Sequence, residues 1–253
     1  MTALLSAPPP AAAPIEIGGL AASYGDRRIF ADLSLSVRPG EIFGLIGLNG
    51  VGKTTLIKCL LGLLQGAKGE LALNGLAAGS VACRRTFAYL PEKFLPSPLL
   101  RGWEFLSLTL SYYGLKLDRP RAEALARRLD FDPAALLRPG RGYSKGMGQK
   151  LGLIGTLLTG LPLLILDEPM SGLDPRARIR LKDCLLEYRA DGKTVFFSSH
   201  ILADIEEICD RIAILHQGRL IYVGKPADLV ARHGGANLER AFLQAIEAAE
   251  RQG

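Results

Sequence analysis

Short apolar runs recur along the chain and predict strands that are covered on both faces. In Leu163–Leu166 four apolar residues follow one another, which is typical of a central parallel strand between two layers of helices. Similar runs lie at Glu41–Ile46, Phe87–Leu90 and Thr194–Phe197. Together these segments predict the sheet of an α/β fold.

Other segments follow the two-residue period of half-buried strands. Leu33–Val37 alternates apolar and polar residues, which indicates an antiparallel strand. Gly69–Gly75 ends in an Asn-Gly turn, and Arg211–Gly224 indicates a hairpin around Gln217–Gly218. The sequence therefore predicts a mixed sheet with flanking helices and, beside it, an antiparallel β subdomain.

The middle of the chain changes to the spacing of helices. From Lys93 to Gly142 the apolar positions recur every three or four residues, as at Trp103, Leu106 and Leu110. This pattern predicts a helical subdomain, about residues 93–160, inserted between two halves of the α/β core.

Composition bears on the partners, the redox environment and the N-terminal segment of the chain. The 253 residues carry a net charge of +6, but the Lys and Arg residues are dispersed, so nucleic acid is not expected as a partner. The four cysteines show no metal-binding spacing and are expected to be reduced thiols, as in the cytosol. Residues 1–14 are rich in Ala and Pro and are predicted to be a disordered tail rather than a signal peptide.

One uncharged run, Leu151–Leu166, is long enough to raise the question of a membrane span. It falls short of the roughly 18 residues that a span requires, and Gly160 and Pro162 interrupt it. A buried helix that leads into a buried strand explains the run better, and the helix is expected to carry Leu151, Ile154, Leu157 and Leu158 on one face. We therefore expect the described chain not to cross a membrane.

The nine residues that directly follow the strand at Glu41–Ile46 match the phosphate-binding pattern G-x-x-x-x-G-K-[ST]. Glycines let the backbone curl so that its N–H groups surround an anion at a helix N-terminus. A helix is predicted to follow from Thr54 to Leu64 without a break. Within this loop the lysine is expected at the β- and γ-phosphates and Thr54 at Mg²⁺. The loop consists of Gly47, Leu48, Asn49, Gly50, Val51, Gly52, Lys53, Thr54 and Thr55.

Two predicted strands end in residues that suit hydrolysis. Asp167 and Glu168 follow a buried strand, at the edge where α/β sheets bind ligands. Asp167 is expected to hold Mg²⁺ and Glu168 to orient or deprotonate a water molecule. His200 ends another such strand and is expected near the γ-phosphate. A surface pair of acids and a structural histidine remain the plainer alternatives, and His216 and His233 receive no role.

The segment Tyr143–Lys150 resembles the signature sequence of the ATP-binding cassette (ABC) family, and the resemblance extends from about Ile15 to Val230. Leu163–Glu168 resembles the family's acidic strand end, and Ser171–Asp174 its D-loop. The resemblance also implies that Tyr24 stacks on the base and that His200 is the switch histidine.

Two positions depart from the family pattern. Lys145 and Met147 replace a glycine and a glutamine of the usual Leu-Ser-Gly-Gly-Gln, whereas Ser144 and Gly146 are kept. Glu92 stands where the family usually has a glutamine, and its oxygens suit Mg²⁺. Both variants resemble a subset of bacterial exporter-type ATPases.

The resemblance implies a phosphate-loop NTPase core and an ATPase that uses ATP and Mg²⁺. It also implies a head-to-tail dimer in which Ser144 and Gly146 of one subunit meet the ATP of the other. The subunit contacts it implies are Ser144, Lys145, Gly146, Met147 and Asp174.

A separate integral membrane permease would complete the transporter, with this chain on the cytoplasmic face of a bacterial cell membrane. The ABC ATPase domain is expected over residues 15–232, followed by a helical extension over residues 233–253.

Two other functions stay open on the sequence. One is a soluble ABC ATPase that acts on a partner outside the membrane, although the chain has a single cassette and no long coiled-coil insertion. The other is a small-molecule kinase or GTPase, against which the signature segment and the lack of Asn-Lys-x-Asp count.

Overall fold

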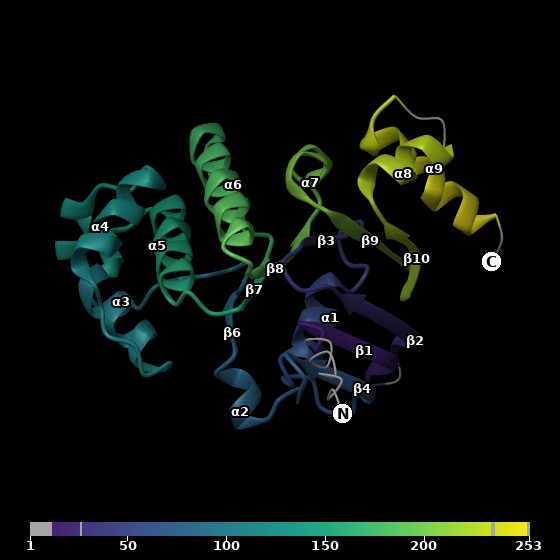
Figure 1. Cartoon of the computed structure of the whole chain (residues 1–253), viewed down its shortest axis with the longest axis horizontal. Coiled ribbons are helices and arrows are strands. Elements are labelled where there is room, and N and C mark those ends of the chain that lie inside the picture. Colours follow the sequence, from purple (N-terminus) through teal and green to yellow (C-terminus); the bar gives the residue numbers. More distant parts are fainter. Residues whose placement is uncertain (1–11, 26, 234–235, 252–253) are drawn as a thin grey trace, which may run out of the picture.

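The protein is described by a computed structural model that covers residues 12–25, 27–233 and 236–251. Two sheets lie at the centre, a block of helices lies to one side, and a pair of C-terminal helices lies at the far end (Figure 1). The mixed sheet, the antiparallel sheet and the helical block confirm the predicted fold class.

The larger sheet has six strands in the order β10-β9-β3-β8-β7-β6. The strands from β9 to β6 are parallel, and β10 pairs with β9 in the antiparallel sense. In this spatial order the strands are Arg219–Gly224, Arg211–His216, Ile42–Ile46, Thr194–Ser199, Leu163–Asp167 and Phe87–Leu90.

The central strands are apolar on both faces because each face has its own core. Leu164 and Leu166 of β7 belong to the cluster under the helical side, and Ile165 belongs to the cluster under the antiparallel sheet. Since side chains alternate along a strand, a slip of one residue would exchange the two sets. This double burial explains the unbroken apolar runs in the sequence.

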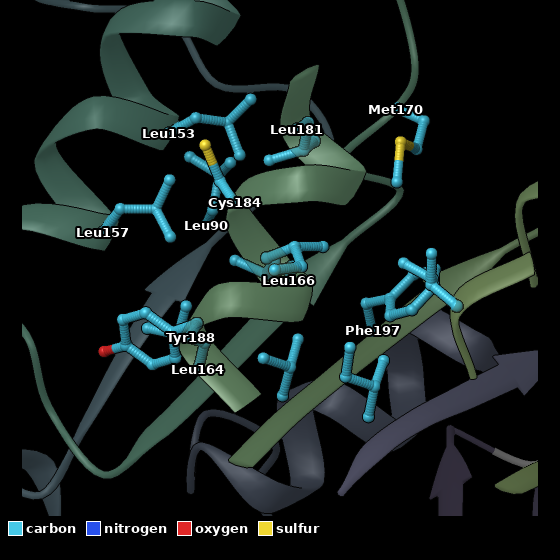
Figure 2. Packing of buried hydrophobic residues seen from close by; sticks show 14 of the residues in the cluster. Leu90, Leu153, Leu157, Leu164, Leu166, Met170, Leu181, Cys184, Tyr188 and Phe197 are labelled. Atoms are coloured by element: carbon cyan, nitrogen blue, oxygen red, sulfur yellow. The ribbon is translucent and has the colours of Figure 1, made fainter. Parts of the chain in front are cut away.

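Helices α5 (Lys145–Leu158) and α6 (Pro175–Ala190) cover one face of this sheet. Figure 2 shows Leu153 of α5 and Leu181 of α6 gathered over Leu166 of β7. Every residue of α5 from Gly148 onward is buried, so it is a core helix rather than a helix with one apolar face. The sequence pattern of four leucine and isoleucine positions underestimates that burial.

The helical block extends outward from α5. It contains α3 (Gly102–Ser111), α4 (Arg119–Arg128) and the short 3₁₀ helices Pro133–Leu137 and Gly140–Gly142. Both α3 and α4 pack against α5. The predicted change to helical spacing is confirmed here.

The smaller sheet is antiparallel and runs in the order β2-β1-β4-β5. Its strands are β1 Ile15–Tyr24, β2 Arg27–Val37, β4 Lys68–Leu73 and β5 Leu76–Ala77. Helices α1 Lys53–Leu60 and α2 Val81–Arg84 pack beside this sheet. Helix α1 ends sooner than the sequence predicts, at Leu60, because Gly62 adopts φ +66° and its ideal Cβ would lie 2.4 Å from Gly79.

The C-terminal part of the chain closes the other end of the larger sheet. Helices α7 (Leu202–Ile208), α8 (Pro226–His233) and α9 (Leu238–Glu250) pack on one another. Phe242 and Ile246 of α9 join the same core as α5 and α6. Helix α9 is therefore packed on the larger sheet's core.

Two predictions, the N-terminal tail and the role of the Tyr24 side chain, fall largely outside the described residues. Most of the predicted tail lies outside the described residues, although Pro14 is buried and its carbonyl accepts a hydrogen bond from the Asn74 N–H. Tyr24 closes strand β1, and its side chain lies outside the described part. Over the described ranges, no helix combines the length and apolar character needed to cross a membrane.

Candidate active site

The phosphate-binding loop begins where buried strand β3 ends. A Cβ placed on Gly47 would lie 2.5 Å from the carbonyl oxygen of Leu215, the neighbouring strand's end. Only glycine fits this close approach of two backbones. The start of the loop is therefore fixed against strand β9.

The other end of the loop opens helix α1. Gly52 is the N-cap with φ +111°, a conformation that residues with a Cβ rarely adopt, and no side chain caps the helix. The N–H groups of the first turn are thus left for a ligand. Lys53 bends back over the loop, and its Nζ donates to the Gly47 carbonyl at 2.7 Å.

Strand β7 brings Asp167 and Glu168 to the same edge of the sheet, where β8 ends beside it. Ser198 joins the two residues, because its hydroxyl donates to Asp167 Oδ1 at 2.5 Å and accepts from the Glu168 N–H at 3.0 Å. Sequence reasoning missed this serine. Ser198 lies two residues before His200, and the parallel register of β7 and β8 sets it opposite Asp167. The position of Ser198 near the end of a predicted strand was the available sign in the sequence.

Glu168 is the centre of the site. Its Oε1 lies 3.4 Å from Lys53 Nζ, and its Oε2 lies 2.8 Å from His200 Nδ1. Because a carboxylate only accepts, His200 Nδ1 carries the proton in this contact. Glu168 is 7% exposed and adopts φ +49°, which is uncommon for a residue with a side chain. The strained backbone turns the carboxylate towards both Lys53 and His200.

These groups share one cavity of about 390 Å³ with the first turn of α1. Leu48 is exposed, Val51 packs against the core, and Gly47 contributes its carbonyl to Lys53. The residues around the cavity are Asn49, Gly50, Gly52, Lys53, Thr54, Thr55, Glu92, Glu168 and His200.

Side-chain oxygens of the kind that magnesium binds lie at or near this cavity. Thr54 and Glu92 line it, and buried Asp167 precedes Glu168 at the end of β7. Burial, together with the charges of Asp167 and Glu92, raises the pKa of Tyr89 to about 12, so both carboxylates lie close to this phenol. The described residues contain no ready cluster of three metal-binding side chains. Magnesium would therefore rely on phosphate oxygens for its remaining ligands.

The signature segment lies outside this cavity. Ser144 is the N-cap of α5, and its hydroxyl accepts from the Met147 N–H at 3.2 Å. Gly146 packs close to the D-loop, since its ideal Cβ would lie 3.2 Å from the Gly172 carbonyl oxygen. One chain thus keeps Ser144 and Gly146 away from its own Lys53.

The D-loop is tied to the signature helix. Asp174 caps α6 by accepting from the Ala177 N–H at 2.9 Å, and its Oδ2 lies 3.3 Å from Lys150 Nζ of α5. Lys145 and Met147 begin the same helix; Lys145 is exposed and Met147 partly buried. Four of the five predicted subunit contacts thus lie at the start of α5, and the fifth, Asp174, is linked to that helix through Lys150.

A second ionic network went unnoticed in the sequence. Asp204 of α7 is buried, lies 2.5 Å from Arg178 Nη2 and 3.5 Å from Lys182 Nζ, and so links α7 to α6. Lys182 also contacts Glu207. These contacts hold the helix that follows His200 against the helix that follows the D-loop.

Comparison with known proteins identifies the family and the fold. A family model described as "ABC transporter" matches residues 30–171. A solved structure, described as the ATP-binding subunit of an ABC transporter, is 35% identical with a TM-score of 0.85, and the match covers 91% of this chain and 98% of that one.

Two curated relatives show the range of similarity. An ABC transporter ATP-binding protein of Nostoc sp. is 43% identical over 78% of this chain and 60% of its own length. Nod factor export ATP-binding protein I of Burkholderia orbicola is 34% identical over 89% of this chain and 75% of its own length.

The chain spans about three fifths of the length of the cyanobacterial relatives that it matches. The family is nevertheless shown by the match over residues 30–171 together with the likeness to a solved ATP-binding subunit. The chain therefore belongs to the ABC transporter family, of which it carries the ATP-binding ATPase domain.

Proposed function

We propose that this chain hydrolyses ATP as one subunit of an ABC exporter and drives transport through a separate membrane subunit. The observation that carries the proposal is the convergence of Lys53, Glu168 and His200 at one cavity. The three residues come from the start of α1, the end of β7 and the end of β8.

Each group has a task that its surroundings support. Lys53 and the uncapped N–H groups of α1 bind the phosphates of ATP. Glu168 accepts a proton from the attacking water, and His200 Nδ1 orients that carboxylate. Thr54, Asp167 and Glu92 would hold Mg²⁺, which supplies positive charge to the phosphates. Tyr24 is proposed to stack on the adenine.

The cavity is half of a complete site. Ser144 and Gly146 do not line it, yet Ser144 opens a helix N-terminus that suits a phosphate. A second subunit in head-to-tail orientation would bring this segment over the bound ATP. The contacts would run through Ser144, Lys145, Gly146, Met147 and Asp174.

The proposals of export and of a membrane partner are supported by the relatives and by exposed apolar side chains. A similar protein carries the name Nod factor export ATP-binding protein. Near the helical block, Leu95, Leu99 and Tyr112 are each more than 70% exposed, which suits a protein partner. We place the chain on the cytoplasmic face of a bacterial cell membrane, with the ATPase domain over residues 15–232, its helical subdomain over about 93–160, and a C-terminal extension over 233–253.

Replacement of Glu168 by glutamine tests the catalytic assignment. Glu168→Gln should lower ATP turnover by roughly 10²- to 10⁴-fold, the usual contribution of a general base. ATP affinity should remain, and an ATP-bound dimer should accumulate in sedimentation velocity runs. Glu187→Gln is the matched control, because Glu187 is exposed and pairs with Arg128 away from the cavity.

Near-normal turnover by Glu168→Gln would remove this residue from catalysis. The transporter assignment needs its own measurement, namely purification of the tagged chain from detergent-extracted membranes. Recovery of the chain without any polytopic membrane protein would favour an ATPase with a partner outside the membrane.

A further inference from the structure

A buried ionic network joins the two helices that follow β7 and β8, the strands that end at Glu168 and His200. Asp204 of α7 is 5% exposed, and its Oδ2 lies 2.5 Å from Arg178 Nη2 of α6. Its Oδ1 lies 3.5 Å from Lys182 Nζ, one turn further along α6. Two cations of α6 thus meet the buried carboxylate of α7.

The two helices do not need these charges in order to pack. Leu181 of α6 and Ile205 of α7 are fully buried in the same apolar core. A buried ion pair adds little net stability over apolar residues of similar size. What it adds is direction, because the flat guanidinium of Arg178 donates along fixed N–H directions. The network is therefore suited to fixing where α7 lies along α6.

The network lies about one helical turn from the candidate site at both of its ends. Arg178 follows Asp174 of the D-loop by four residues, and its N–H donates to the Asp174 carbonyl at 3.0 Å. Asp204 follows His200 by four residues, and α7 begins between them at Leu202. A shift of one helix along the other would therefore move the D-loop relative to His200.

These contacts close a ring that begins and ends at Glu168. On one arm the Glu168 carbonyl accepts from the Ser171 N–H at 3.0 Å, where the D-loop begins. On the other arm the Glu168 carboxylate lies 2.8 Å from His200 Nδ1. The Arg178–Asp204 pair joins the two arms through α6 and α7. The His200 side chain is 48% exposed, so its place against Glu168 depends on the backbone that carries it.

We propose that Arg178 and Asp204 are a positioning pair for ATP hydrolysis, which keeps His200 against Glu168 and makes that contact depend on the D-loop. The proposal rests on the proposed roles of His200 and Glu168 in hydrolysis. Neither Arg178 nor Asp204 lines the cavity, so the pair acts through the two helices and not on ATP. A second subunit that approaches Asp174 would reach His200 by this route.

Steady-state ATPase assays on the full chain test the pair. Asp204→Asn should lower turnover about 10-fold, less than the roughly 10²-fold cost of a misplacement by a full ångström. The KM for ATP should stay within about twofold, because the phosphate-binding loop is not displaced.

Replacements of Arg178 test the other partner. Arg178→Gln is the milder variant for folding, since Lys182 still faces Asp204. It should lower turnover as much as Asp204→Asn, and the double variant should lower it no further, because both substitutions remove the same contact. Arg178→Lys, which keeps a charged donor, should recover most of the turnover.

Arg189→Gln is the matched control. Arg189 lies about three turns after Arg178 on α6 and pairs with Asp210, just after α7, at 2.7 Å. It also fastens α6 to the α7 segment, but away from the D-loop and His200. Its replacement should leave turnover within about twofold. Equal losses of turnover in Arg189→Gln and Asp204→Asn would overturn the proposal, because any contact between the two segments would then serve.

Nuclear magnetic resonance of isotope-labelled histidine reports on the His200 ring itself, without ATP. The chain has three histidines, and His200→Gln identifies the His200 signals. At about pH 8, above the ordinary histidine pKa of about 6.5, Nδ1 should carry the ring proton because it donates to Glu168. Asp204→Asn should move part of the signal to the tautomer protonated on Nε2, and Arg189→Gln should not. An unchanged tautomer in Asp204→Asn would overturn the proposal.

Turnover by His200→Gln separates failure of this proposal from failure of the proposed function. If His200→Gln abolishes turnover while Asp204→Asn and Arg178→Gln leave it intact, the positioning role alone is wrong. If His200→Gln turns over normally, the role of His200 in hydrolysis is wrong, and the positioning role is wrong with it.

Discussion

Two helix N-termini in this protein suit an anion, but only one is surrounded by reactive groups. Helix α1 begins at Gly52 with no side-chain cap, and Lys53, Glu168 and His200 converge beside it. Helix α5 begins at Ser144, whose hydroxyl already caps it through the Met147 N–H. Ser144 does not line the cavity that Lys53, Glu168 and His200 share.

The difference indicates how hydrolysis would be controlled. The α1 end can bind phosphates and activate water, whereas the α5 end can add hydrogen-bond donors alone. Since Ser144 does not line the cavity of its own chain, a second subunit would have to bring an α5 end to the same ATP. Turnover would then require the dimer, while simple ATP binding would not.

Replacing each of two buried lysines should produce the largest difference between the α1 end and the α5 end. Lys53 contacts the Gly47 carbonyl and Glu168, and Lys150 contacts the Asp130 carbonyl and Asp174. Lys53→Met should weaken ATP binding by roughly 10- to 100-fold, because a charged donor to phosphate is lost. Fluorescence titration with a labelled ATP analogue measures this change.

Lys150→Met serves as the structural counterpart. Its free energy of unfolding should fall by about 1–3 kcal/mol, since buried acceptors lose their donor, and ATP affinity should stay within about twofold. Equal losses of ATP affinity in both variants would show that the α1 end has no special role.

Two serines that cap helices test the role of the α5 end, with smaller expected effects on stability and turnover. Ser144 accepts from the Met147 N–H and Ser80 from the Cys83 N–H, both at 3.2 Å. Either replacement by alanine should cost about 1 kcal/mol in urea unfolding. Only Ser144→Ala should also lower turnover, by about 10-fold, because it removes a donor to the second subunit's ATP.

Steady-state ATPase assays at saturating ATP decide between the two serines. A Ser144→Ala enzyme that turns over like Ser80→Ala would leave Ser144 with the capping role alone.

The smallest expected effect is the contribution of the Asp174 charge, in the D-loop, to the stability of the fold at acidic pH. The Ala177 N–H, together with Lys150, lowers the pKa of Asp174 below its ordinary value. A lowered folded-state pKa stabilises the fold above the unfolded pKa of about 3.9, and this contribution is lost as pH falls through the folded value. Asp174→Asn keeps a capping side chain without the charge.

Urea midpoints at pH 5 and pH 3 measure that contribution. The unsubstituted chain should lose more stability between the two values than Asp174→Asn. The same loss in both would show that the Asp174 charge adds nothing to folding.

The sequence predicted the strands well because both of their faces are buried. Leu163–Leu166 and Thr194–Phe197 show their burial directly as unbroken apolar runs. The Asn-Gly turn and the Gln217–Gly218 hairpin turn were equally clear, since their glycines and Asn74 all adopt positive φ. Local chemistry decides such features.

Longer-range packing explains the errors. Helix α1 was expected to reach Leu64, but it ends at Leu60 where Gly62 meets Gly79. Helix α5 was expected to have one apolar face, but glycines and a buried Gln149 let neighbours pack all around it. Neither cause lies within the helix's own periodic pattern.

In the candidate site, too, local motifs identified some residues, whereas contacts between distant segments were missed. The sequence identified Lys53, Glu168 and His200 one by one through their motifs. It gave no sign of the Ser198 bridge between Asp167 and Glu168, which depends on the register of two parallel strands. It likewise missed the Asp204 network.

The sequence by itself determined the phosphate-binding loop, the buried strands and the residue types that suit ATP hydrolysis. These features follow from backbone conformation and from the side chains of neighbouring residues. Only the tertiary structure decided that Glu168 meets both Lys53 and His200 while Ser144 stays outside their cavity. The reason is physical: the crossing of strands through the sheet sets which distant residues meet, and no local pattern records that distance.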